Sequence, residues 1–98
     1  MANYTVRVEL IGVSHDAKKY EDLHEEMEKK KFRRFITLDS GSFNLPPAEY
    51  SKVTDDTMSE VLAAAKSAAT AVVGSDKKHR VLVTRSAEPR AHWNLEPQ

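Results

Sequence analysis

The sequence predicts a small α+β domain with the element order β-α-β-β-α-β. This is a ferredoxin-like arrangement, in which two helices cover one face of a four-stranded antiparallel sheet. Residues 4–13 alternate apolar and polar side chains, as a half-buried strand does. Two segments with helical spacing of apolar residues, 17–31 and 57–74, flank a pair of short strand-like segments joined by a turn. A final apolar segment, residues 79–85, completes the order.

The first strand divides its side chains between two faces. The face expected to pack on the core carries Tyr4, Val6, Val8 and Leu10. The face expected to stay open carries Thr5, Arg7 and Glu9. In the helix that follows, the apolar side consists of Ala17, Tyr20, Leu23, His24 and Met27. Ser14 or Asp16 is expected to cap the first turn of that helix.

The middle of the chain is expected to form a hairpin. Residues 32–39 are interpreted as the second strand, with Ile36 and Leu38 facing the core. A turn at residues 39–42 leads to a third strand over residues 43–50. Pro46 and Pro47 fall inside that third strand. Because proline cannot donate to a ladder, we expect the strand to end or bulge there.

The second helix carries the clearest structural signal in the chain. Thr57 and Glu60 have the spacing of a capping box, and Gly74 is suited to a left-handed stop. The apolar stripe consists of Met58, Val61, Leu62, Ala65, Ala68, Ala69 and Val72. We therefore expect a helix over residues 57–74 that lies on the sheet, with Leu62 in the contact.

The tail, residues 86–98, is long for a strand end and holds Trp93, the single tryptophan. Tryptophan is a common interface anchor, and an open sheet has edges that need cover. We expect the tail to cross back over its own domain or to add to a neighbouring protomer, with Trp93 buried. The predicted assembly is a homodimer formed through a sheet edge or through this tail.

Composition limits the class of protein. The 98 residues fit one domain, 1–98, of which 86–98 is the tail. Fifteen basic and fifteen acidic residues cancel, which favours neither DNA nor a membrane surface as partner. The absence of cysteine excludes disulfides and thiol catalysis. The first ten residues do not resemble a signal peptide, so we expect a cytoplasmic protein.

The most charged stretch, residues 29–34, surrounds Phe32 with five cations. It is interpreted either as an RNA contact or as the cationic end of a helix, where cations complement the helix dipole. The candidate RNA-binding residues are Lys30, Lys31, Arg33, Arg34, Phe35 and Arg7. Phe32 or Phe35 is expected to stack on a base. The expected topology brings Lys52 and Arg85 to the same edge and places Lys77, Lys78 and Arg80 at the opposite one.

Two residues are candidates for catalysis. His24 is either a partly buried structural histidine or a general base, and Asp16 is either a helix cap or a ligand-holding carboxylate. None of the four histidines has the spacing of a zinc motif. We predict neither a metal site nor a cofactor.

Several segments together resemble the GhoS-like family, small bacterial and prophage proteins of type V toxin–antitoxin systems. These segments are residues 4–10, 20–27, 45–50 and 81–84, with Trp93 in the tail. The resemblance implies a ferredoxin-like fold and an endoribonuclease that cleaves the messenger RNA of a membrane-active toxin. It places His24 at a helix position where the family has an arginine implicated in activity. It also places Asp16 near an aspartate that related CRISPR-associated nucleases carry after the first strand, and it implies exchange of C-terminal segments between protomers.

Two functions follow from these observations. The first is an endoribonuclease antitoxin that cleaves or binds single-stranded RNA. The alternative is a non-catalytic, homodimeric interaction protein, which the zero net charge favours.

Overall fold

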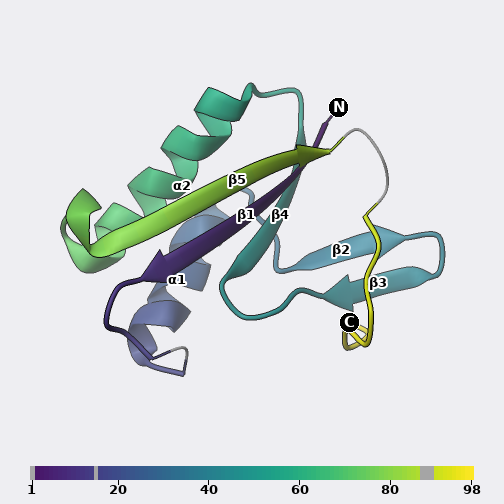
Figure 1. Ribbon diagram of the computed structural model, residues 1–98, viewed down its shortest axis with the longest axis horizontal. Helices are drawn as coiled ribbons and strands as arrows, with labels where there is room; N and C mark the ends of the chain where they lie inside the picture. Colours follow the sequence, from purple (N-terminus) through teal and green to yellow (C-terminus); the bar gives the residue numbers. More distant parts are fainter. Residues whose placement is uncertain (1, 15, 87–89) are drawn as a thin grey trace.

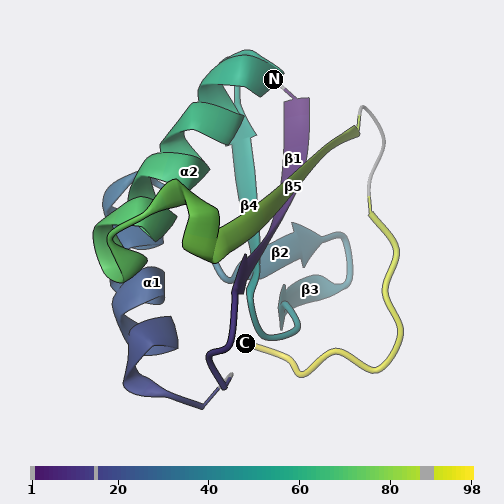
Figure 2. The same cartoon turned by 60° about the vertical axis from the view of Figure 1, so that its left-hand side comes forward.

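The structure is a computed structural model that describes residues 2–14, 16–86 and 90–98 (Figure 1). Its elements, in chain order, are β1 (Ala2–Leu10), α1 (Lys18–Lys29), β2 (Phe35–Leu38), β3 (Gly41–Asn44), β4 (Glu49–Thr54), α2 (Met58–Val73), the short 3-10 helix η1 (Asp76–Lys78) and β5 (His79–Ser86). Strands β4, β1 and β5 form an antiparallel sheet in that order, with β1 in the centre. Both helices cover one face of this sheet (Figure 2). The predicted α+β class and the two helices on one face are confirmed.

The expected four-stranded sheet is wrong, because β2 and β3 form a separate two-stranded sheet. Among the described residues, a single β-bridge pairs β4 with the chain that leads into β2. The Arg33 N–H donates to the Ser51 carbonyl (2.8 Å), and the Ser51 N–H donates to the Arg33 carbonyl (2.7 Å). Pro46 and Pro47 lie between β3 and β4, so the hairpin is free to leave the sheet after this bridge.

The prolines end the third strand as expected, but the segment after them was misassigned. The predicted strand over residues 43–50 is in fact the end of β3 and the start of β4. Residues 52–54, outside the predicted strand, continue β4 and pair with β1.

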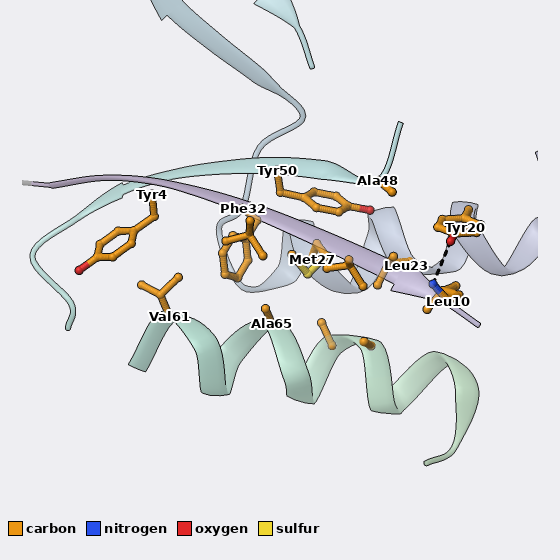
Figure 3. Packing of buried hydrophobic residues seen from close by; sticks show 14 of the residues in the cluster. Tyr4, Leu10, Tyr20, Leu23, Met27, Phe32, Ala48, Tyr50, Val61 and Ala65 are labelled. Atoms are coloured by element: carbon orange, nitrogen blue, oxygen red, sulfur yellow. Dashed lines mark hydrogen bonds between the residues drawn. The ribbon is translucent and has the colours of Figure 1, made fainter. Parts of the chain in front are cut away.

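The core lies between β1, β4 and the two helices (Figure 3). The predicted inner face of β1 is confirmed, since Tyr4, Val6, Val8 and Leu10 are almost completely buried. From α1, Tyr20, Leu23 and Met27 enter the same core. The Leu10 N–H donates to the Tyr20 hydroxyl at 2.9 Å, which satisfies a polar group that the aromatic ring brings into the core.

Helix α2 has the predicted ends but a narrower buried stripe than expected. The capping box between Thr57 and Glu60 is present, and Gly74 ends the helix in the left-handed region at φ 78°. The residues that contact the core are Val61, Ala65, Ala68 and Ala69. Met58 and Leu62 remain 45% and 36% exposed, so placing them against the sheet was wrong. Small alanines bring the helix close to its partners, and this close packing leaves its larger flanking residues outside.

The expected cap of α1 is also wrong. Ala17 occupies the N-cap position and makes no side-chain cap bond. The Ser14 hydroxyl instead donates to the Asp16 carboxylate, so these two side chains pair with each other outside the helix.

The tail crosses back over its own domain, along the outer edge of β3. The Asn44 N–H donates to the Glu96 carbonyl (2.8 Å), and the Gln98 N–H donates to the Ser42 carbonyl (2.9 Å). The ring of His92 lies 4.1 Å from that of Phe43, centroid to centroid. The expected burial of Trp93 is wrong, because its side chain is 92% exposed. Backbone bonds and His92 anchor the tail, so tryptophan is not needed for this contact.

Adjacent positions on α2 provide a stability test. Val61→Asp places an unpaired charge in the core and is expected to lower the free energy of unfolding by at least about 3 kcal/mol. Leu62→Asp is expected to cost less than about 1 kcal/mol, because the carboxylate reaches water. Urea denaturation of both variants measures the difference. Equal destabilisation by the two substitutions would contradict the observed orientation of α2.

Candidate nucleic-acid interface

A groove of about 1130 Å³ opens where β2 turns away from β4. Its walls are the C-terminal half of α1, the segment 31–37 and the outer side of β4. Within the described residues, β4 pairs with β1 on its inner side and has only the Arg33–Ser51 bridge on its outer side. The missing length of a fourth strand is therefore what creates the groove.

Cations dominate the lining of the groove. They are Lys31, Arg33, Arg34, Lys52 and Arg90. Two carboxylates, Glu28 and Asp56, also line it. The excess of positive charge at one site contrasts with the zero net charge of the whole chain. Such a local excess favours an anionic ligand.

Lys52 ties one wall of the groove together. Its side chain is mostly buried, and Nζ donates to the Lys30 carbonyl at the end of α1 (3.0 Å). The same ammonium lies 4.9 Å from the ring centre of Phe32 and 3.6 Å from a carboxylate oxygen of Asp56. The helix carbonyl and the aromatic face both attract a cation. Lys52 therefore mainly stabilises the wall, because its ammonium is already held by these contacts.

The two aromatic residues proposed for base stacking differ in exposure. Phe32 is 2% exposed and packs in the core, which leaves Phe35 as the candidate for stacking on a base. Phe35 is partly exposed, and the Arg33 guanidinium lies 5.4 Å from its ring centre. An arginine over an aromatic face leaves a flat surface on which a base can stack.

His24 enters the groove from α1 and is held by Tyr50 of β4. The distance from His24 Nδ1 to the Tyr50 hydroxyl is 2.6 Å. Burial, and then the nearby charge of Arg34, lower the pKa of His24 from 6.5 to about 4. Burial raises the pKa of Tyr50, so its hydroxyl keeps its proton. The pair is thus a neutral imidazole and a neutral phenol at pH 7.

The tautomer of His24 decides what its second ring nitrogen can do. When the Tyr50 hydroxyl donates to Nδ1, Nε2 carries the ring proton and is a donor. When Nδ1 donates to the hydroxyl, Nε2 is an acceptor that can take a proton from a hydroxyl group. The same side chain can therefore bind a phosphate oxygen or act as a base.

Arg90 reaches the groove from the tail across the open face of the sheet. Its Nη1 donates to the Ser51 hydroxyl (2.8 Å), the Thr5 hydroxyl (3.2 Å) and the Tyr4 carbonyl (3.4 Å). Its Nε is buried without a hydrogen-bond partner among the described residues. Burial lowers the pKa of Arg90. These three oxygens are neutral, so the charge of Arg90 adds to that of the groove.

The structure brings together most of the residues predicted as a site. Those that line the groove are His24, Lys31, Arg33, Arg34 and Phe35, together with Lys52. Lys30 does not line the groove, and its carbonyl accepts a hydrogen bond from Lys52. Arg7 is exposed on the open sheet face, opposite Glu49 of β4. Asp16 lies just before the N-terminus of α1, whereas the C-terminal half of this helix lines the groove. Arg85, on β5, does not line the groove.

Sequence reasoning missed Arg90 and Tyr50 as parts of the site. Tyr50 belongs to the inner face of β4, and alternation along that strand could have indicated a side chain directed at α1. Arg90 lies in an irregular tail, where neither periodicity nor a motif indicates its contacts. Its position depends on the whole chain.

Comparison of the chain with protein-family models, with curated proteins and with solved structures gave no match. The resemblance to the GhoS-like antitoxins therefore stays a prediction. Neither described helix is long and apolar enough to cross a membrane.

The low pKa of His24 makes stability depend on pH. The folded pKa, about 4, lies below the usual 6.5, so the unfolded chain takes up this proton first as the pH falls. The contribution of His24 is complete above pH 6.5 and is lost as the pH falls towards 4.

His24→Asn isolates this contribution, because an amide can keep the bond to Tyr50 but does not titrate. We expect the free energy of unfolding of the wild-type protein to fall more steeply between pH 6.5 and 4 than that of the variant. Urea denaturation at a series of pH values measures both curves, and the carboxylates contribute equally to each. Parallel curves would show that the imidazole is not held in its neutral form.

Proposed function

We propose that the protein binds single-stranded RNA in this groove. The proposal rests on one observation, the gathering of five cations around a partly exposed aromatic residue in a groove. Arg33 and Arg34 are exposed and can contact phosphates, while Phe35 offers a ring face to a base. A single strand exposes its bases for such stacking, whereas a duplex hides them.

Cleavage of the bound strand is the second part of the proposal, and His24 is its catalytic residue. Nε2 of the imidazole accepts the proton of a ribose 2′-hydroxyl, whose oxygen then bonds to the adjacent phosphorus. The bond from phosphorus to the 5′-oxygen breaks, and water protonates the leaving oxygen. Arg34, whose charge already acts on His24, stabilises the negative charge that develops on the phosphate. Asp16 lies outside the groove and has no part in this scheme.

The order of the strands supports a ferredoxin-like interpretation of the fold. In the order β4-β1-β5, the Arg33–Ser51 bridge stands where the fourth strand of a ferredoxin-like sheet would begin. The chain is then a ferredoxin-like domain whose second strand is displaced into a hairpin. This reading and the resemblance of its segments to endoribonuclease antitoxins both favour RNA as the ligand. An antitoxin acting on a toxin messenger RNA is the corresponding cellular role.

Binding is tested with a labelled single-stranded RNA oligonucleotide. Arg33→Gln combined with Arg34→Gln is expected to weaken binding. The negative slope of log K against log salt is expected to become less steep by about 0.7 per lost phosphate contact. Lys77→Gln combined with Lys78→Gln, in η1, is the matched control and is expected to leave both quantities unchanged. Fluorescence anisotropy over a salt series measures them. Equal losses in the two double variants would remove the groove as the binding site.

Cleavage is tested separately from binding. His24→Asn leaves Arg33, Arg34 and Phe35 in place and is expected to retain most of the RNA affinity, but to lower the cleavage rate by at least about a hundredfold, as loss of a general base does. Denaturing gels of the labelled RNA follow the products, with the wild-type protein purified in parallel as the control. If the wild-type protein binds without cutting, the function is RNA binding alone. If the variant still cuts, the base lies elsewhere.

A further inference from the structure

Strand β5 forms the second edge of the three-stranded sheet, far from the groove. It has eight residues, His79–Ser86, and pairs with β1 along its whole length. No described strand pairs with its other side. Figure 2 shows β5 at the border of the sheet, with α2 beside it. An edge of this length is an attachment point for another strand.

The hydrogen bonds of β4 show which residues of each strand direct their N–H and C=O groups towards which neighbouring strand. Ser51 exchanges both of its bonds with Arg33, so its neighbours Tyr50 and Lys52 direct their backbone groups at β1. Their partners on β1 are Val6 and Tyr4, which therefore bond towards β4.

The same alternation continues across β1 to β5. Thr5 and Arg7, between the residues that bond to β4, direct their backbone groups at Thr84 and Leu82. The N–H and C=O groups of Val81 and Val83 consequently point outward, away from the sheet. They form a row of donors and acceptors that a further strand can use.

The edge has few of the usual devices that prevent strand addition, and its charged residues are Arg80 and Arg85. Between residues 79 and 86 there is no proline, glycine or lysine. Arg80 is turned along the open face, where Nη1 donates to Glu9 Oε1 at 2.7 Å. The charge of Arg80 is thereby kept within the chain and does not guard the edge.

Apolar side chains flank this edge on both faces of the sheet. On the open face, Leu82 is 64% exposed. On the helix face, the Thr70 hydroxyl lies 2.9 Å from Nε2 of His79, so this flank of α2 is beside β5. Val81 and Val83, on the helix face of β5, are partly exposed. Exposed apolar side chains on both faces of a free edge favour a partner of the same kind.

We propose that a second copy of this chain pairs its β5 with β5, antiparallel, so that the two sheets form one continuous sheet across a two-fold axis. Outward-pointing groups must face each other, which restricts the register to pairs of odd with odd residues. The axis passes between the two copies of Leu82. Val81 then lies opposite Val83 of the second copy, and Arg80 lies opposite Thr84.

This register is chosen by its cross-strand pairs. Two leucines meet in the closer, non-hydrogen-bonded type of pair, and no two arginines are opposite each other. A shift that puts Val83 on the axis places Leu82 opposite Thr84 and Val81 opposite Arg85. That register keeps only one apolar pair, Val83 with Val83, and loses the leucine pair and both pairs of Val81 with Val83. The groove lies at the other edge of each sheet, so this dimer does not depend on the proposed RNA binding.

Sedimentation equilibrium over a concentration series tests the assembly. The wild-type chain is expected to associate reversibly to a dimer. Leu82→Lys places two cations at the axis and is expected to raise the dimer dissociation constant by at least about tenfold. Val53→Lys is the matched control, because Val53 is 55% exposed on the other edge strand, β4. A wild-type chain that stays monomeric, or equal effects of the two substitutions, overturns the proposal.

The register has its own test. Thr84→Glu puts a carboxylate opposite Arg80 of the second copy and is expected to strengthen the dimer, whereas Thr84→Arg is expected to weaken it. The chain has no cysteine, so Leu82→Cys introduces a single thiol. Residues opposite each other in a non-hydrogen-bonded pair are close enough for a disulfide. Mild oxidation is expected to give a covalent dimer with Leu82→Cys and not with Val53→Cys, and the reverse result excludes the β5 pairing.

Discussion

The Arg33–Ser51 bridge controls how the two parts of this molecule are joined. Its two backbone bonds fix the end of α1 to β4, and no further pair of the two segments follows. The chain thus begins a fourth strand and leaves it after one residue. The core beneath remains closed, because Phe32, the residue just before the bridge, is buried. Beyond the bridge, no fourth strand covers the outer side of β4, and the groove occupies this place. The candidate site therefore results directly from an interrupted strand.

The elements that could be predicted from the sequence are those fixed by local chemistry. The capping box of α2 needs only Thr57 and Glu60, three residues apart, and Gly74 ends the helix through its own backbone freedom. The inner face of β1 follows from alternation alone. The route of the β2–β3 hairpin depends instead on the tail, which bonds to β3 from more than fifty residues away in the chain. No pattern in either segment specifies that contact, so continuation of the sheet was the natural expectation.

Some features of the candidate site could likewise be predicted from the sequence, and others depend on the fold. The cations of residues 31–34 are adjacent in sequence, and a charged run at a helix end is visible without a structure. His24 was a candidate from its place beside the apolar stripe of α1, but its low pKa depends on its burial and on the charge of Arg34, both of which the fold provides. Trp93 shows the opposite error. Burial was expected from the residue type, whereas the tail is held by backbone bonds and by His92 against Phe43.

The electrostatics of the groove couple an anionic ligand to the protonation of His24. Arg34 contributes to the low pKa of the imidazole, since a second positive charge beside it is unfavourable. A phosphate bound to Arg34 neutralises that contribution, so the pKa of His24 rises when the ligand binds. By linkage, protonation of His24 must strengthen phosphate binding to the same degree. A phosphate on Arg34 therefore offsets only the smaller of the two causes of the low pKa, because burial, the larger cause, remains when the ligand is bound.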